Sequence, residues 1–139
     1  MNVLIHAFRA DSSRHQQIRP WLDDVVASDA AFGVPDLVLS GFLRIVTNRR
    51  AFKEPDDLDD ALEFAEQLRS YPNAVRIAPG QRHWSIFTRL CRVTGASGNT
   101  VPDAYIAAIA IESGSELITA DRGFARFPKL NWRDPVEQL

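Results

Sequence analysis

The sequence lacks the features that mark membrane, secreted and zinc-binding proteins. No apolar run approaches the ~20 residues that a membrane-spanning helix needs, and no basic segment followed by an apolar one marks a signal peptide. We therefore expect a cytoplasmic protein without membrane contact. The single cysteine, Cys91, cannot form a disulfide within the chain, and no cysteines and histidines have the spacing of a zinc site. Cys91 lies in an apolar-periodic stretch, which predicts a role in core packing.

The sequence also has no excess of basic over acidic residues, with 16 lysines and arginines against 18 aspartates and glutamates. The formal net charge is −2, so the overall field of the protein does not attract phosphate, and binding of nucleic acid would need a local cluster of basic side chains. A Gly-rich phosphate loop is missing as well, which leaves nucleotide binding without support. A phosphoryl-receiver domain would need an acidic pair after the first predicted strand, where this chain has His6, Ala7 and Phe8.

What the sequence does contain is an alternation of strand and helix patterns. At 139 residues and 45% hydrophobic composition, the chain is long enough for one domain with a single core. Because the predicted strands are separated by helices, we expect a parallel sheet covered on both faces. The predicted strands are 3–8, 31–35, 74–79, 116–120 and 130–134. The predicted helices are 14–27, 37–48, 54–70, 81–94 and 102–113, and Gly95 and Gly114 end the last two.

Polar residues near the ends of the predicted strands are the candidates for a functional site. In a parallel sheet the functional crevice lies beyond the carboxyl ends of the strands. Asp121 follows one strand directly, and Asp36 and Asp103 stand at the starts of helices. Taken singly, each of these acids is more commonly a helix cap or a turn former than a metal ligand.

Carboxylates gathered at that edge of the sheet would favour a divalent cation. Two carboxylates about 4 Å apart repel each other by roughly 4 kcal/mol at an effective dielectric constant near 20. Such a pair is stable only if one carboxyl is protonated or a cation lies between the two. With no paired histidines or cysteines, the donor set favours Mg²⁺ or Mn²⁺, which promote phosphodiester hydrolysis. The sequence allows this clustering but does not require it.

Four segments together resemble the toxins of VapBC toxin–antitoxin modules, which are PIN-domain ribonucleases. The segments are NVLIHAFRADSSRH, PDLVLSGFLRIVTNRRAF, NTVPDAYIAAIAIESG and ITADRGFARF, and the resemblance covers nearly the whole chain. It implies a single PIN domain over residues 1–139, a three-layer α/β/α sandwich around a central parallel sheet of four to five strands. It also implies a type II toxin, an Mg²⁺- or Mn²⁺-dependent endoribonuclease that cuts structured RNA of the tRNA or rRNA class. Such toxins are inhibited by a cognate VapB-type antitoxin and are commonly homodimers.

The resemblance also assigns roles to individual residues. Asp103 and Asp121 match the acids that bind the metal, while Asn2 and Thr119 match polar residues that orient those ligands. The family begins with Asp-x-Asn, and in this chain Met1 stands at x. The first metal-binding acid would therefore precede Met1. We expect the chain to lack the start of its first strand and to be impaired as a nuclease in this form.

A second departure from the family lies in the helix 37–48. The family often has Glu three residues before the helix arginine, where this chain has Gly41 before Arg44. Glycine has no side chain to bind a metal, so Asp36 would be the substitute if it points to the same end of the sheet. The two departures favour a rival hypothesis. In that hypothesis the chain is a PIN-like module with an impaired metal site, which binds RNA or its antitoxin without cutting.

Several basic side chains are candidates for phosphate contacts. Arg49 and Arg50 follow a predicted helix end, where a solvated helix terminus explains them equally well. The full candidate set is Arg9, Arg49, Arg50, Lys53 and Arg122.

The remaining histidines, aromatic residues and one acid are predicted to be structural or solvated. His6 is predicted to be a wall residue, and His15 and His83 are predicted to lie on the surface. Glu112 is nine residues after Asp103, which predicts a solvated acid on the opposite face of that helix. Helical spacing predicts that three apolar side chains, Trp84, Phe87 and Leu90, pack in the core.

Overall fold

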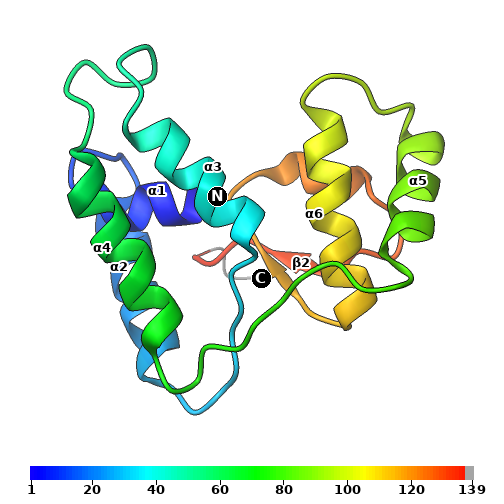
Figure 1. The fold of residues 1–139 in the computed structure, drawn as a ribbon, viewed down its shortest axis with the longest axis horizontal. Coiled ribbons are helices and arrows are strands. Elements are labelled where there is room, and N and C mark those ends of the chain that lie inside the picture. Colours follow the sequence, from blue (N-terminus) through cyan, green and yellow to red (C-terminus); the bar gives the residue numbers. More distant parts are fainter. Residues whose placement is uncertain (137–139) are drawn as a thin grey trace. The chain divides into compact units, whose positions relative to one another are not determined.

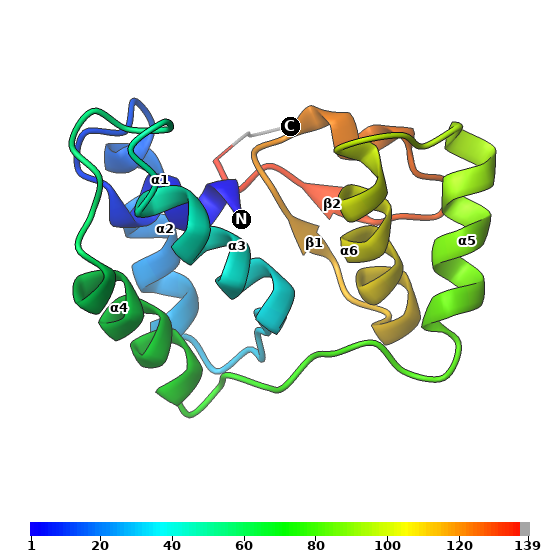
Figure 2. The same ribbon diagram turned by 45° about the horizontal axis from the view of Figure 1, so that its top comes forward.

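The chain divides into two compact units. The computed structural model describes residues 1–136, and the units are Met1–Arg76 and Ile77–Leu139. Figures 1 and 2 show the helices and strands of both units. Each unit has buried apolar side chains of its own, and the predicted single domain over 1–139 stays a prediction. None of the helices in the described part of the chain is long and apolar enough to cross a membrane.

Four helices build the first unit. They are α1 (Asn2–Phe8), α2 (His15–Ala27), α3 (Asp36–Val46) and α4 (Leu58–Ser70). Phe42 of α3 is completely buried, and its ring centroid lies 5.4 Å from that of Phe8 and 5.5 Å from that of Phe64. These rings join three helices in one aromatic cluster, since such pairs add to the stabilisation from burial. The three helices predicted within this unit are confirmed with slightly shorter bounds.

The predicted first strand, 3–8, is wrong, because these residues form the helix α1. Its buried residues are Val3, Leu4 and Ala7, whose spacing places them on one helical face. The N–H groups of Leu4 and Ile5 both donate to the carbonyl oxygen of Met1, at 3.1 and 3.2 Å, and so begin the helix. A short apolar run does not distinguish a buried strand from a buried helix by its periodicity, and here packing decided for the helix.

The second and third predicted strands contribute a single parallel bridge. Phe32 pairs with Ala74 between the predicted strands 31–35 and 74–79. The N–H of Phe32 donates to the carbonyl oxygen of Asn73 at 3.1 Å, and the N–H of Val75 donates to that of Phe32 at 2.8 Å. The two segments therefore pair in parallel, the direction predicted for the sheet, although they do not extend into a ladder.

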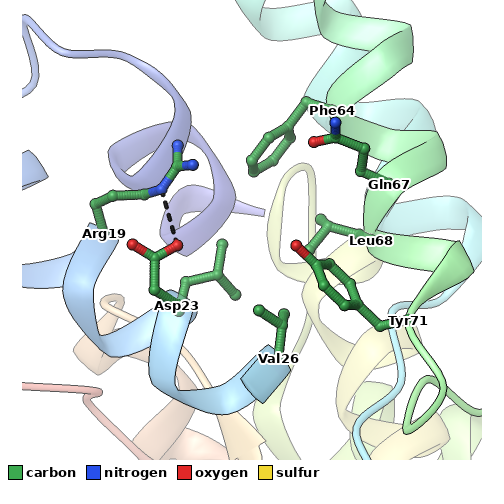
Figure 3. Close-up of a pocket in the computed structure, with 8 residues that line it drawn as sticks. Arg19, Asp23, Val26, Phe64, Gln67, Leu68 and Tyr71 are labelled. Atoms are coloured by element: carbon green, nitrogen blue, oxygen red, sulfur yellow. Dashed lines mark hydrogen bonds and ion pairs between the residues drawn. The ribbon is translucent and has the colours of Figure 1, made fainter.

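A shallow hollow lies between α2 and α4 (Figure 3). Apolar side chains from both helices line it, among them Val26, Leu68 and Phe64. At its edge the Nε of Arg19 donates to Oδ1 of Asp23 at 3.2 Å, an ion pair one helical turn apart. The apolar side of α2 thus faces α4, and the charged residues stay at the solvent edge.

The second unit combines two helices with a small parallel sheet. Its elements are α5 (His83–Thr94), α6 (Thr100–Ser113), β1 (Leu117–Ile118), the 3₁₀ helix η1 (Arg122–Arg126) and β2 (Trp132–Arg133). β1 and β2 pair in parallel, with Leu117 opposite Trp132 and Ile118 opposite Arg133. The predicted strands 116–120 and 130–134 are therefore confirmed in position and direction, at shorter length.

Helix α6 is the most apolar element of this unit. Six of its residues are buried: Ala104, Ile106, Ala107, Ala108, Ile109 and Ala110. Gly114 ends α6 at φ 66° and Gly95 ends α5 at φ 61°, both in the left-handed region that favours glycine. The two predicted helix ends are confirmed.

The structure as a whole is rich in helix and poor in strand. Residues 1–136 form six α-helices, one two-stranded parallel sheet and one isolated parallel bridge. The predicted central sheet of four to five strands is therefore not confirmed in size. Both pairs that the described residues form, β1 with β2 and Phe32 with Ala74, are parallel, which confirms the predicted direction.

Candidate functional site

The start of α6 places Asp103 at a helix N-terminus. The preceding turn forms because the N–H of Thr100 donates to the carbonyl oxygen of Ser97 and that of Val101 to Gly98, both at 3.1 Å. Asp103 lies in the first turn of the helix and is half-buried. A carboxylate there complements the positive end of the helix dipole, as expected for a cap as well as for a ligand.

The end of β1 places Asp121 beside that helix in the same unit. Thr119 is buried, and its Oγ1 accepts a hydrogen bond from the N–H of Asp121 at 3.1 Å. Oδ1 of Asp121 accepts a hydrogen bond from the N–H of Gly123 at 2.8 Å and so caps η1. The Thr119 hydroxyl therefore holds the backbone of Asp121, which is what an orienting residue does. The turn-forming and the ligand interpretations of Asp121 are compatible, because only one of its two oxygens is used by the cap.

The two carboxylates interact with each other. Burial raises the pKa of the Asp103 carboxyl above its ordinary value, and the negative charge of Asp121 raises it further. Arg126 opposes this shift in the pKa of Asp103 through its positive charge. The second unit thus places Asp121 close enough to Asp103 to destabilise the charged form of Asp103, and shifts of this kind are common at functional sites.

Arg126 is a site residue that the sequence analysis missed. Its Nε donates to the carbonyl oxygen of Gly123 at 2.8 Å, and its Nη1 donates to Oγ1 of Thr100 at 3.0 Å. The guanidinium therefore links η1 to the first residue of α6, and its positive charge stabilises the ionised form of Asp103. In this segment Arg122, and not Arg126, is the predicted phosphate contact. The five-residue 3₁₀ helix, which no pattern predicted, directs Arg126 back toward α6.

The donor set of this pair fits a hard divalent cation. Among residues 1–136, no group of three or more histidine, cysteine, aspartate or glutamate side chains could hold a metal ion. Mg²⁺, however, commonly takes one or two carboxylates and completes its shell with water and substrate phosphate. Asp103 and Asp121 provide such a two-carboxylate set, and an ion there would relieve the repulsion between them.

Comparison with known proteins identifies the family. The sequence pattern of the PIN domain family matches residues 1–130. Over 137 residues the chain is 44% identical to VapC ribonuclease Mb2897 of Mycobacterium bovis and to Ribonuclease VapC43 of Mycobacterium tuberculosis, spanning 99% of this chain and 93% of each relative. The chain belongs to the VapC ribonucleases of the PIN-domain family. Ribonuclease VapC25 of Mycobacterium tuberculosis is 42% identical over 137 residues, spanning 98% of this chain and 96% of that relative.

A solved structure agrees with this assignment in fold. The chain superposes on one from the crystal structure of VapBC2 from Rickettsia felis bound to a DNA fragment from its promoter, with a TM-score of 0.66. The match has 15% sequence identity and covers 95% of this chain and 92% of that one. At this identity the likeness shows the fold alone. It confirms the α/β PIN class, and the family relationship makes the chain a PIN-domain toxin ribonuclease of the VapBC class.

In this VapC chain, Asp36 is placed in the first unit. It is the first residue of α3, it is exposed, and its Oδ1 accepts a hydrogen bond from Nη1 of Arg69 at 2.9 Å. The N-cap of α3 is Pro35, and no side chain caps the helix. The predicted cap by Asp36 is therefore wrong. Its predicted part in a metal site stays a prediction, in competition with the Arg69 ion pair.

Gly41 and the N-terminus of the chain face each other within this unit. Gly41 is buried, and a Cβ added there would collide with the terminal methyl of Met1. A glutamate at this position would therefore need Met1 to move. The role predicted for Asn2, at the start of α1, stays a prediction as well.

The predicted phosphate contacts differ strongly in exposure. Arg49, Arg50, Lys53 and Arg122 are exposed, whereas Arg9 is only 7% exposed. The guanidinium of Arg9 donates to the carboxylates of Asp11 and Asp56. Its burial and this pairing favour a structural role over the predicted direct contact with phosphate.

Two aromatic residues of α5 lie opposite to where the sequence analysis placed them. His83 was predicted on the surface but is buried, and its Nε2 lies 3.0 Å from the carbonyl oxygen of Tyr105. Trp84 was predicted in the core but is 68% exposed. Within α5, His83 is therefore packed against Tyr105 of α6 and Trp84 faces solvent, whereas Leu90 is buried as predicted. Cys91 is half-buried and free.

Glu112 is also more than a solvated acid. Its Oε1 accepts the N–H of Gly80 at 2.6 Å and its Oε2 accepts the N–H of Arg82 at 2.9 Å. The hydrogen bond from Gly80 lowers the pKa of Glu112, and the one from Arg82 lowers it further. Glu112 therefore fastens the segment before α5 to the end of α6.

Proposed function

We propose that this chain is an Mg²⁺- or Mn²⁺-dependent endoribonuclease toxin of a type II toxin–antitoxin system, which hydrolyses structured RNA of the tRNA or rRNA class. The observation that carries the proposal is the placement of two acids in one unit of a chain that belongs to the VapC ribonucleases: Asp103 lies in the first turn of α6, and Asp121 caps η1. A site that keeps two interacting carboxylates has a use for a cation.

The residues of the second unit would divide the work as follows. Asp103 and Asp121 would hold the cation, and Thr119 would keep Asp121 in place through the hydrogen bond to its N–H. Arg126, held by Gly123 and Thr100, would contribute positive charge beside the scissile phosphate. When bound, the cation supplies Lewis acidity toward the phosphodiester.

An antitoxin partner belongs to the same proposal. Its support is the VapC naming of the relatives and the fold that this chain shares with one chain of the VapBC2 structure from Rickettsia felis. We propose that a cognate VapB-type antitoxin binds this chain and inhibits cleavage. A homodimer is proposed on the family resemblance.

RNA cleavage with purified protein and defined metals tests the proposal. Asp103→Asn and Asp121→Asn should each lower Mg²⁺-dependent cleavage by more than about 100-fold, because changes to residues that merely orient metal ligands already cost 10- to 100-fold. Thr119→Val should lower Mg²⁺-dependent cleavage by about 10- to 100-fold. Asp59→Asn, an exposed acid in the first turn of α4, is the matched control and should cleave normally.

The rival hypothesis of an impaired module, which the two departures from the family pattern favour, has one supporting observation in the structure. Residues 1–136 provide no group of three metal-binding side chains. If the unmodified chain binds RNA or antitoxin but cleaves no RNA at any Mg²⁺ or Mn²⁺ concentration, the impaired module is the better description. Cleavage that survives both Asp substitutions would place the chemistry elsewhere and refute the proposed site.

A further inference from the structure

The loop between α3 and α4, residues 47–57, carries an exposed group of basic side chains. Arg49, Arg50 and Lys53 are all exposed. The ion pairs of unit 1 use Arg9, Arg19 and Arg69, but none formed by residues 1–136 uses the three basic side chains of this loop. These three cations lie within five residues of one another, and the same loop also carries the acids Glu54, Asp56 and Asp57, of which Asp56 is paired with Arg9.

The side chain of Arg9 contacts this loop at several positions. It is the residue after α1, and its Nη1 donates to Oδ2 of Asp56 at 2.7 Å. Its Nη2 donates to the carbonyl oxygen of Glu54 at 3.1 Å, and its guanidinium carbon lies 3.7 Å from the centroid of the Phe52 ring. One buried side chain thus holds three successive parts of the loop.

Asp11 completes the set of partners of Arg9. Its two carboxylate oxygens accept hydrogen bonds from Nε at 3.0 Å and from Nη2 at 2.8 Å. A buried guanidinium needs partners in this number, because an unpaired buried charge is strongly unfavourable. Lysine lacks the planar fork that makes two parallel bonds to Asp11 while stacking on Phe52, so arginine is specifically required here.

The loop is also ordered by its own backbone. The N–H of Phe52 donates to the carbonyl oxygen of Asn48 at 3.1 Å, and the N–H of Asp56 donates to that of Val46 at 2.8 Å. Oδ1 of Asn48 accepts the N–H of Arg50 at 2.9 Å. A loop that is ordered before it meets a ligand loses less conformational entropy on binding, which increases affinity.

We propose that the 47–57 loop is a preorganised phosphate-binding arm for the RNA substrate, and that Arg9 is its positioning residue. Arg49, Arg50 and Lys53 contact RNA phosphates, while Arg9 contacts only protein. This inference rests on the proposed ribonuclease function, since it takes RNA as the polyanion. It explains why Arg9, which lies in the segment NVLIHAFRADSSRH, is buried.

RNA binding as a function of salt tests the arm itself. The probe is unfractionated tRNA, and binding is measured in the Asp121→Asn background without divalent metal, so that the RNA stays intact. The triple variant Arg49→Gln, Arg50→Gln, Lys53→Gln should bind about tenfold more weakly at low salt. Its plot of log affinity against log salt should be flatter by about 2, because each lost phosphate contact removes about 0.7–0.9 from the slope.

A thermodynamic cycle tests the positioning role of Arg9. Arg9→Lys should weaken RNA binding about three- to fivefold when the basic loop is intact, and should have no further effect in the triple variant, because Arg9 acts only through the loop. In cleavage assays the same change should raise KM and leave kcat unaltered. Arg19→Lys, which alters an exposed ion pair of the same unit (Figure 3), is the matched control and should change neither.

Each other outcome contradicts a stated part of the inference. If Arg9→Lys does not fold, Phe52→Leu takes its place, since it removes only the ring beneath the guanidinium. An equal loss from Arg9→Lys in both backgrounds would show a merely structural role and overturn the positioning claim. Unchanged RNA affinity in the triple variant overturns the arm, and a loss of antitoxin affinity alone assigns the loop to the protein partner instead. Absence of any RNA binding by the parent protein would refute the proposed function itself.

Discussion

Replacing Asp103 by asparagine should stabilise the protein in the absence of metal. Burial and the charge of Asp121 raise the pKa of Asp103 in the folded state above the unfolded value of about 3.9. For an acid with a raised folded-state pKa, the stabilisation is complete below the unfolded pKa and is lost as the pH rises through the folded one. At neutral pH the ionised carboxylate therefore weakens the fold, and a neutral amide of the same shape removes that cost.

The size of this effect is limited by solvent. Asp121 is exposed, so water screens its repulsion of Asp103, and Asp103→Asn also loses the favourable interaction of the carboxylate with the helix dipole. We therefore expect a net gain of less than about 1 kcal/mol at pH 7. The gain should shrink to nothing below about pH 3, where the carboxyl of the parent is neutral in both states.

Divalent metal should reverse which of the two proteins, the parent or Asp103→Asn, is the more stable. At a Mn²⁺ concentration 100 times the dissociation constant, binding to the folded state adds about 2.7 kcal/mol, which corresponds to a rise in Tm of about 10 °C for a chain of this size. Asp103→Asn loses one of two carboxylates and should gain far less. The parent is then the more stable protein in Mn²⁺, and the variant is the more stable one in EDTA.

Thermal unfolding followed by circular dichroism, in EDTA and in Mn²⁺ from pH 3 to pH 8, measures both effects. Asp59→Asn is the control, because it also removes an acid from the first turn of a helix but belongs to the first unit and not to the unit that holds Asp103 and Asp121. It should lose a few tenths of a kcal/mol and keep the full response to Mn²⁺. A lower Tm of Asp103→Asn in EDTA at pH 7, together with an unchanged Mn²⁺ response, would refute the reasoning.

Three further predictions concern structural residues of the second unit. Glu112→Gln should melt lower than the parent at pH 7. Because the folded-state pKa of Glu112 is lowered, its contribution is present above the unfolded pKa of about 4.3 and lost as the pH falls through the folded one, so the difference should vanish in acid melts. Gly114→Ala, at a φ of 66°, should lower the free energy of unfolding by about 1 kcal/mol or more in urea titrations. In the same titrations Trp84→Ala should cost less than about 0.5 kcal/mol and Leu90→Ala about 2–5 kcal/mol, and the reverse order would show that α5 faces the other way.

Much of the local structure was predictable because it depends on neighbours in the chain. The ends of α5 and α6 follow from Gly95 and Gly114, which adopt backbone angles that other residues avoid. The pattern of residues 116–121 predicted Asp121 directly after a strand, and in the structure it lies three residues after β1, as the N-cap of η1. These features need only a few residues, so a sequence pattern describes them well.

The errors have a common cause in packing between distant segments. The run Val3–Ile5 suits a strand and a helix equally, and α1 formed because its apolar face is buried in the first unit. His83 and Trp84 are adjacent, and only the rotation of α5 against α6 decides which is buried. Arg9 was predicted to contact phosphate because no pattern could pair it with Asp56, 47 positions away.

The sequence by itself determined the family, the boundaries of most helices and the two acids that a metal site would need. These are encoded in short motifs, glycine positions and hydrophobic periodicity, which act within a few residues. The tertiary structure alone decided that Arg9 is buried under the 47–57 loop, that Arg126 joins the acids and that Glu112 fastens α5. Each of these depends on a contact between segments far apart in the chain, and a side chain's burial and partners are set only when those segments pack.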